Sequence, residues 1–344
     1  MEPELKIYTI ADLRTWLIDN NPPAGLSEHV IAPVRAYAIL NNPYVKDEDA
    51  VVAAIYEGEE LAAFTASFPD MYEGKRIWWA STLWCNPKFQ GQGYGLIVIG
   101  SLKEVHEPEL TFDRWGARET VEIFNCFGYK TIYTSRYVLG DKAINRNTLK
   151  GKLAYTLQEL KKSLHHTPYS NAWYSLKYST FVDGEAYTFM LAHRGKDLFF
   201  REQKMLNWIT RFPFFQGAHL YNRTEKDTIF SSYVEQYEYS VVKVYTEHKL
   251  VGVYMLRCNN EIMSIVSIYY QADYKEVVFS SIADHFKKVH AISIVTEDRW
   301  LMEYLKKNIY FPRITEEKIS LSTTDDMELP QTYGLQLMDG DSFA

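Results

Sequence analysis

Apolar runs separated by short polar segments mark the first part of the chain. The segments 50–56, 61–68 and 76–87 are rich in Val, Ala and aromatic residues. Runs of this length, bounded by polar or Gly-containing turns, are typical of strands. The pattern predicts an antiparallel three-stranded meander, with a loop over residues 69–75 and one more short strand over residues 5–10.

Helical signals lie on both sides of this meander. Ser27 is suited to cap a helix that runs to about Leu40, because a serine oxygen accepts hydrogen bonds from first-turn amides. After the meander, apolar residues recur on one side of segment 96–105, as expected of a helix that packs on a sheet. The first part then continues with a weak strand at 110–115, a helix at 117–127 that Gly128 ends, and a strand at 129–139.

The second part of the chain repeats the first. The stretch VVAAIYEGEELAAF from Val51 has a counterpart in VVKVYTEHKLVGVY from Val241. Any single match of this kind can be coincidental, since Val-rich hairpins are common, but the signals that follow keep the same order, which favours duplication. They are a strand at 261–270, a helix at 274–290, a strand at 291–295, a helix at 297–308 and strands near the C-terminus.

These patterns predict an α+β fold with a mixed sheet, built from two domains that each have a mostly antiparallel central sheet flanked by helices. We place the domains at 1–139 and 179–344, with a helical connector over 140–178. The connector has a basic face, which we interpret as solvated surface (Lys150, Lys152, Lys161 and Lys162). Its adjacent histidines, His165 and His166, point about 100° apart on a helix and form no metal clamp.

Composition narrows the classes of function. The formal charge is -7 and the pI is about 5.8, which argues against a nucleic-acid partner, because such proteins usually present a basic face. The sequence contains neither a secretory signal nor an apolar run long enough to span a membrane, so we expect a cytoplasmic protein. Three widely separated cysteines fit reduced thiols better than a disulfide framework (Cys85, Cys126 and Cys258).

A glycine-rich loop directly precedes the helix at 96–105. Gly91, Gly93 and Gly95 stand at alternate positions in NPKFQGQGYG. Glycine lets backbone amides approach a ligand closely, and a helix N-terminus favours an anion, so the loop is predicted to hold phosphate. It is not a P-loop, because no Lys and hydroxyl residue follow the last glycine, and its spacing does not match the Rossmann pattern.

The loop resembles motif A of the GNAT superfamily, the acetyl-CoA-dependent N-acyltransferases. Gln90, Gly93 and Gly95 occupy the defining positions of that motif, and the order of strand, loop and helix is the same. The resemblance covers roughly residues 6–139. It implies that acetyl-CoA is the acyl donor, that no metal takes part, and that a small-molecule or peptide amine is the acceptor.

The resemblance also assigns the cofactor contacts. The loop amides would hold the pyrophosphate of coenzyme A, and the fourth strand would contribute backbone amides that stabilise an oxyanion. The residues so assigned are Leu83, Trp84, Cys85, Gln90, Gly91, Gln92, Gly93, Tyr94, Gly95 and Phe124. Trp84 belongs to an aromatic cluster with Trp78 and Trp79, which we interpret as sheet core, with an acceptor pocket as the alternative.

The chain departs from the family pattern in its catalytic groups. Phe124 stands where a tyrosine often protonates the leaving thiolate, and Ala117 stands near a frequent asparagine. The fourth strand has no carboxylate, yet an amine with a pKa near 10 must lose a proton before it attacks. Asp113 and Glu73 are the candidates for the base, and for each a solvated surface carboxylate is the alternative.

The second half has no counterpart of the glycine loop. Its corresponding segment reads QADYKEVVFSS, and no glycine occurs between Gly252 and Gly334. We therefore predict one cofactor site, in the first half, and a degenerate second domain. The function that these observations favour is an acetyltransferase in which the amine attacks directly. The alternative is a noncatalytic acyl-CoA-binding or interaction protein that retains the loop.

Overall fold

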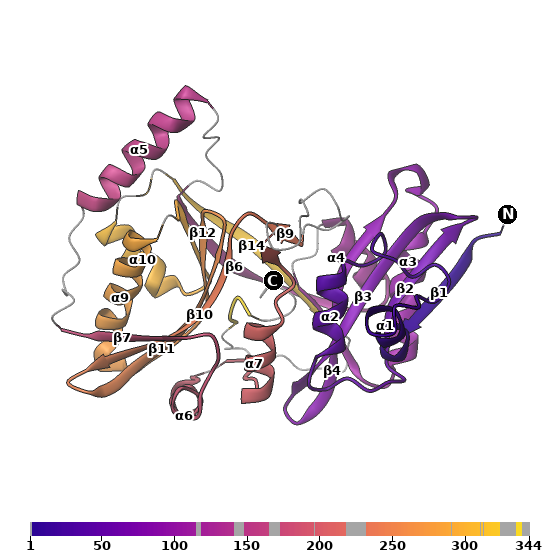
Figure 1. Ribbon diagram of the computed structural model, residues 1–344, viewed down its shortest axis with the longest axis horizontal. Coiled ribbons are helices and arrows are strands. Elements are labelled where there is room, and N and C mark those ends of the chain that lie inside the picture. Colours follow the sequence, from indigo (N-terminus) through magenta and orange to yellow (C-terminus); the bar gives the residue numbers. More distant parts are fainter. Residues whose placement is uncertain are drawn as a thin grey trace.

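Two similar halves lie side by side in the computed structural model of the chain (Figure 1). The residues that the structure describes are 2–114, 118–140, 148–164, 173–195, 197–217, 232–289, 291–309, 311, 313–323 and 335–338. Ala117, His165 and His166 lie outside this part of the chain, as do the side chains of Lys150, Lys161 and Lys162.

The first half contains the predicted meander. Its elements are β1 (Glu4–Thr9), α1 (Ile10–Leu17), α2 (Pro33–Leu40), β2 (Ala50–Glu57), β3 (Glu60–Tyr72), β4 (Lys75–Cys85), η1 (Pro87–Phe89), α3 (Tyr94–His106), β5 (Leu110–Arg114), α4 (Arg118–Cys126) and β6 (Lys130–Gly140). β2 pairs with β3 and β3 with β4, both antiparallel. Gly128, with φ +78°, follows α4 as predicted.

Two predictions about this half are wrong. The predicted helix from Ser27 begins only at Pro33, because a turn in which Val30 and Ile31 donate to the Ser27 carbonyl precedes it. Proline favours the first helical position and disfavours helix before it. The predicted loop over 69–75 is mostly strand: β3 continues to Tyr72, and only Glu73 and Gly74 form the turn, both with positive φ.

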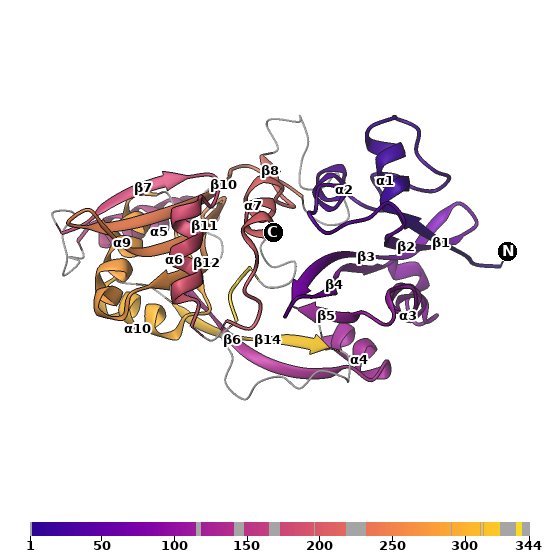
Figure 2. The same ribbon diagram turned by 90° about the horizontal axis from the view of Figure 1, so that it is seen from below.

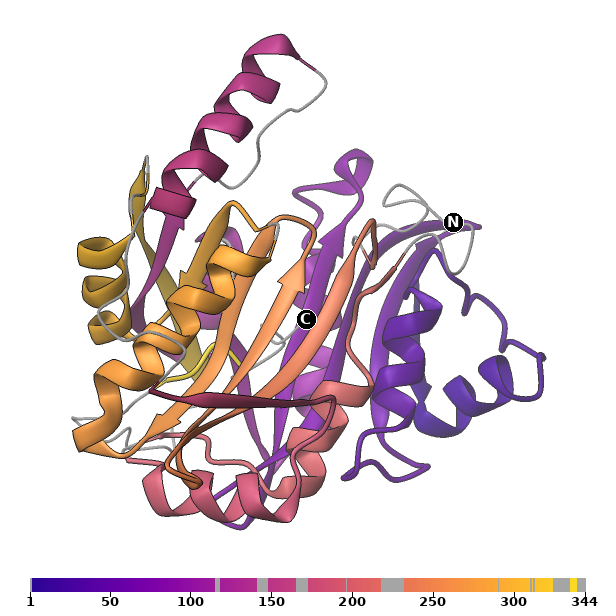
Figure 3. The same ribbon diagram turned by 60° about the vertical axis from the view of Figure 1, so that its left-hand side comes forward.

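The second half repeats this order. Its elements are β7 (Ser175–Ser179), α6 (Gly184–His193), α7 (Gln203–Arg211), β8 (Gln216–Gly217), β9 (Tyr233–Val234), β10 (Tyr237–Thr246), β11 (Lys249–Asn259), β12 (Ile262–Tyr270), η3 (Ala272–Tyr274), α9 (Lys275–Lys288), β13 (Ser293–Thr296), α10 (Arg299–Asn308) and β14 (Ile314–Thr323). The predicted strands and helices from Val241 to Asn308 are present, and the described residues near the C-terminus contain one strand, β14. The entry segment β7, α6 and α7, which the sequence patterns did not reveal, corresponds to β1, α1 and α2. Helix α5 (Leu149–Leu164) lies between the halves in sequence and stands away from the sheet (Figure 3).

Among the described residues, twelve strands form one sheet in the order β1-β2-β3-β4-β5-β14-β6-β13-β12-β11-β10-β7. Read from either edge, this order gives corresponding strands of the two halves, from β1 and β7 at the edges to β14 and β6 at the centre, so it is palindromic. The two halves therefore exchange their last strands: β14 pairs with β5, and β6 pairs with β13. Figure 2 shows β14 beside β6, reaching toward the first half. The domain limits at 139 and 179 remain predictions.

Matching irregularities support the duplication. In the first half one extra residue, Ala62, bulges from β3 opposite β2, and in the second half Val251 bulges from β11 opposite β10. A second pair of bulges lies one strand further on, at Thr82 in β4 and Val266 in β12. Bulges re-aim side chains and are frequent beside functional sites.

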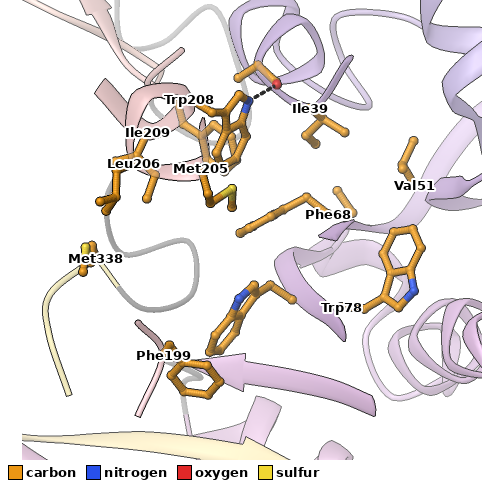
Figure 4. Close-up of a cluster of buried hydrophobic side chains, with 14 of the residues drawn as sticks. Ile39, Val51, Phe68, Trp78, Phe199, Met205, Leu206, Trp208, Ile209 and Met338 are labelled. Atoms are coloured by element: carbon orange, nitrogen blue, oxygen red, sulfur yellow. Dashed lines mark hydrogen bonds between the residues drawn. The ribbon is translucent and has the colours of Figure 1, made fainter. Parts of the chain in front are cut away.

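The helices cover both faces of the sheet. The side chains of α3 and α4 pack on one face of the first half, while α9 and α10 pack on the matching face of the second. The opposite face carries α1, α2, α6 and α7 over one continuous core that spans both halves (Figure 4). Within it Trp208 of α7 donates from its indole nitrogen to the Ala38 carbonyl of α2 at 2.7 Å. The halves are thus joined by strand exchange and by a shared core.

Candidate functional site

The glycine loop enters α3 in the geometry that an anion site requires. Gly91 and Gly93 have φ of +86° and +81°, a region that side chains other than glycine rarely adopt. Gly93 is the N-cap of α3, and the first intrahelical bond runs from the Ile97 amide to its carbonyl. The first-turn amides have no acceptor within a helix and lie at the positive end of its dipole.

The third glycine has a different role. A Cβ on Gly95 would lie 3.0 Å from Cys85 Sγ, so glycine at this position allows close packing of α3 on β4. A Cβ on Gly91 or Gly93 would meet no other atom of the described chain within 4 Å. The two preceding glycines therefore leave room for a ligand against the backbone, whereas Gly95 fixes the helix. Burial raises the pKa of the Cys85 thiol, and the Gly95 amide opposes this shift.

Beside the loop, β4 and β5 separate. They pair in parallel only over Ile77–Trp79 and Leu110–Phe112, although β4 continues to Cys85. On its other edge β5 pairs with β14 over Phe112–Arg114. The bulge residue Thr82 lies on the separated part of β4 and has φ +49°, a conformation that costs a β-branched residue roughly 1–3 kcal/mol. Strain of this kind is concentrated at ligand sites.

The bulge sets which side chains of β4 face which layer. Leu83 and Cys85 pack with α3, together with Tyr94. Trp84 faces the other layer, with its ring centroid 6.0 Å from that of Phe64. Trp78 and Trp79 are buried sheet core as predicted. Gln90 and Gln92 are exposed on the loop, and the buried Tyr94 hydroxyl donates to Glu57.

A small cavity lies between α3, α4 and the strands β3, β4 and β5. Ala80, Ile99, Leu102 and Phe124 supply its apolar wall. Phe124 is buried, and its ring centroid lies 4.8 Å from that of Tyr129. Burial raises the pKa of Tyr129.

His106 closes the same cavity. Its ring stacks on Trp78 with centroids 3.6 Å apart, and its Nε2 lies 3.0 Å from Ser67 Oγ. Burial, reinforced by Arg76, lowers the pKa of His106 to about 3. The imidazole is therefore neutral at physiological pH and is part of the wall.

The two predicted base candidates lie apart. Asp113 is buried on β5, opposite Ser322 of β14, and its carboxylate contributes to the raised pKa of Tyr129, so it lies on the side of α4. Glu73 is exposed in the turn before β4. The loop follows the other end of that strand, which at about 3.3 Å per residue is roughly 30 Å away.

Sequence reasoning missed two titratable groups close to the bulge. Glu28 and His29, from the segment between α1 and α2, line a hollow together with Thr82 on the face opposite α3. His29 and Trp84 also line an adjoining, larger open hollow of about 660 Å³. No pattern in the sequence relates residue 28 to residue 82, since only the packing of the loop on the sheet brings them together.

The second half keeps the strand separation but not the loop. β12 and β13 pair only over Ile262–Ser264, and β12 continues to Tyr270. The next segment is η3, followed by α9 from Lys275, with Tyr274 as its N-cap. Every residue of this turn has a side chain, so a phosphate could not approach the backbone as closely as the two open glycines permit in the first half.

The loop residues fit the pyrophosphate of an acyl-CoA donor, because two open glycine positions at the N-terminus of α3 form a cradle that a Cβ would fill. Among the described residues no group of three or more His, Cys, Asp or Glu is placed to hold a metal ion. In that same part of the chain, no helix has both the length and the apolar character to cross a membrane.

Comparison with known proteins gives matches of structure alone. No protein-family model matches the chain, and no curated protein matches it. A tandem GNAT protein from the clavulanic acid biosynthesis pathway is similar with a TM-score of 0.51 and 10% identity, over 96% of this chain and 100% of that one. A putative acetyltransferase from Pyrococcus horikoshii is similar with a TM-score of 0.50 and 12% identity, over 94% and 90%.

Identities this low establish a shared fold and nothing about activity. The likeness nevertheless extends over both halves, and it agrees with the palindromic strand order, the paired bulges and the separated β4 and β5. The chain therefore has the tandem GNAT fold, with two copies of the GNAT architecture in one polypeptide.

Proposed function

We propose that this protein is an N-acetyltransferase that moves an acetyl group from acetyl-CoA to an amine by direct attack. The observation that carries the proposal is the open glycine cradle at the N-terminus of α3, placed beside the strand separation and the Thr82 bulge. Bound acetyl-CoA supplies a thioester whose carbonyl carbon is open to an amine nucleophile. The remaining roles fall to groups of the chain itself.

The cradle residues bind and orient the donor. Amides at Gly91, Gly93 and Tyr94 would bind the diphosphate, and no Cβ at either glycine would obstruct its approach. The α3 dipole adds roughly 0.3–1 kcal/mol for an anion at this end. Gly95 holds α3 against Cys85, so the helix N-terminus and the free edge of β4 keep a fixed relative position.

The free edge of β4 is suited to stabilise the developing oxyanion. Because β4 leaves β5 after Trp79, the backbone groups of residues 83–85 on that side are not used by β5. The bulge at Thr82 turns this stretch relative to the rest of the strand. One oriented backbone donor in such a position is worth about 10² to 10³ in rate.

An acceptor would approach from the face opposite α3. The hollow at Thr82 opens there and has Glu28 and His29 in its wall, so these groups are placed to take the proton that the amine must lose. The adjoining hollow has Trp84 and Leu61 as an apolar side and Glu59 and Glu60 as carboxylates. This lining suits a protonated amine that carries an apolar body.

An assay of free-thiol release tests the proposal. Acetyl-CoA is incubated with the protein and a panel of amines that includes arylalkylamines, amino sugars and peptides. We expect at least one amine to raise thiol release well above the rate without an acceptor. Alanine replacements of Glu28 and His29 should lower that rate by about 10² or more, if either group is the base.

A noncatalytic acyl-CoA-binding protein is the second candidate function. Phe124 favours it, because no hydroxyl stands at the position where the family often places the proton donor. Acetyl-CoA binding together with the same slow thiol release in the presence and absence of every amine would support this candidate. It would contradict the transferase proposal.

A further inference from the structure

The second half contains an open cleft of about 580 Å³ where β12 and β13 separate. This is the place that corresponds, in the duplicated fold, to the separation of β4 and β5. The end of β12, the residues directly after β13, the start of α10, the middle of β6 and the segment after α6 line it, together with Leu335 and Gln336. Both halves contribute, since β6 precedes α5 in the chain.

Charged groups in this cleft differ in exposure. The side chain of Glu297 is only 4% exposed, and Asp197 and Asp298, the N-cap of α10, are half-buried. Arg194 and Arg299 are exposed. The carboxylates of the cleft are thus less exposed than its arginines.

Two acidic groups of the cleft are held in position. Glu297 accepts from Arg114, whose side chain is fully buried, and Arg114 also donates to the Gln336 carbonyl at 3.0 Å. Asp298 accepts from the Leu301 amide at 2.8 Å. Groups fixed by such contacts lose little freedom when they bind a ligand.

Aromatic rings form the sides. Tyr269 and Tyr270 end β12, Tyr137 comes from β6, and Trp300 of α10 is 65% exposed. Rings of this kind give apolar contact area and attract cations through their faces. The lining thus combines stacking surface with separated charges of both signs.

We propose that this cleft binds a small zwitterion of the α-amino-acid type, with its ammonium group toward Glu297 and Asp298 and its carboxylate toward Arg194 and Arg299. The volume lies within the range of pockets for small molecules. A guanidinium fork pairs well with a carboxylate, and the ring faces accept an apolar or aromatic side chain.

The cleft is separate from the proposed transfer site. In the sheet, β4 is followed by β5, β14, β6, β13 and β12. At about 4.8 Å per strand the residues that line the cleft lie roughly 14–24 Å from β4. A ligand of amino-acid size does not span that distance, so it would be a second ligand rather than the acetyl acceptor bound for transfer.

Saturation-transfer NMR with the twenty L-amino acids tests the proposal on the full chain. We expect at least one amino acid to bind. Two analogues of it, the amine that lacks the carboxylate and the acid that lacks the ammonium group, should each bind at least tenfold more weakly. Absence of binding by all twenty would overturn the proposal. Equal binding of the amino acid and both analogues would overturn it too.

Variants locate the ligand. Arg194→Ala and Arg299→Ala should each weaken binding of the amino acid at least fivefold and leave binding of its decarboxylated analogue unchanged. Arg211→Ala, at an exposed arginine of α7, is the control and should alter neither affinity. Gly93→Val, which is designed to disrupt the donor cradle, should retain amino-acid binding. Displacement of the amino acid by acetyl-CoA would place the amino-acid site in the first half and contradict the proposal. These binding measurements do not depend on transferase activity.

Discussion

Asp70 on β3 and Arg201, just before α7, form an ion pair that joins the two halves away from solvent. Arg201 Nε lies 2.8 Å from Asp70 Oδ2, and both side chains are at most 1% exposed. The indole nitrogen of Trp79 donates to the same carboxylate oxygen at 3.0 Å. The contact ties a strand of the first half to the helical layer of the second.

Removal of one partner of the Asp70–Arg201 ion pair should lower the stability of the protein strongly. Asp70→Leu leaves the Arg201 charge buried without its counterion, and we expect a loss of about 3–5 kcal/mol in the free energy of unfolding. The double variant Asp70→Leu with Arg201→Met should recover much of this loss, because no buried charge remains. Urea unfolding measures both, and a double variant that is less stable than Asp70→Leu alone would contradict this account.

Sequence patterns predicted most strands and helices of the first half and those after Val241 because apolar periodicity is a local property, but they missed α1, β7, α6 and α7. They did not predict strand exchange, since β6 and β14 are ordinary amphipathic strands whose partners are chosen by the three-dimensional fold. The segment at Asp70 was expected to be a loop, because Pro69 and Asp70 are unfavourable in strands. Burial of the Asp70 carboxylate against Trp79 and Arg201 outweighs that tendency.

Whether Gly95→Ala stabilises or destabilises the protein should depend on Cys85. Alanine is favoured over glycine inside a helix by about 1 kcal/mol, but its Cβ would lie 3.0 Å from Cys85 Sγ. We expect Gly95→Ala to be neutral or destabilising in the natural chain and stabilising in a Cys85→Ala background. A double-mutant cycle from thermal unfolding gives the coupling, and additive effects would show that the sulfur does not limit this position.

Buried His106 should make stability depend on pH. Its pKa is lowered by burial to about 3, whereas the unfolded chain binds the proton near pH 6.5. Stability is therefore retained above about pH 6.5 and falls as the pH drops from there toward 3, by about 2 kcal/mol between pH 7 and pH 5 for this group alone.

Paired substitutions isolate that contribution. Urea unfolding of His106→Asn should show a smaller loss between pH 7 and pH 5 than the natural chain, whereas His248→Asn, at an exposed histidine, should show the natural loss. The interpretation is wrong if the two variants behave alike.

Phe124→Tyr addresses the missing proton donor. A thiol with a pKa near 8.5 leaves tolerably well at neutral pH without a general acid, so kcat should change by less than about tenfold and acetyl-CoA affinity should stay nearly the same. Steady-state kinetics with an identified acceptor measures the change. A hundredfold rise in kcat would show that the natural chain lacks an effective acid and would favour the noncatalytic function.

The candidate site was predictable only in part. The glycine loop was found because its motif lies within a few consecutive residues of the sequence. Its geometry in the structure agrees with a phosphate cradle. Glu28 and His29 were not found, because they reach Thr82 only through the packing of the α1–α2 segment on the sheet. Glu73 was placed near the site by order along the chain, whereas the length of β4 carries it to the opposite end.

Calorimetric affinity for acetyl-CoA tests the central claim most directly. Gly93→Val should weaken binding tenfold or more, which is about 1.4 kcal/mol, while the natural chain should bind one equivalent. Gly74→Val is a matched control, because Gly74 also has positive φ and open space at its Cβ but lies in the turn before β4. It should keep natural affinity. Equal affinities for the two folded variants, or two equivalent sites per chain, would contradict the assignment of the loop as the single cofactor site.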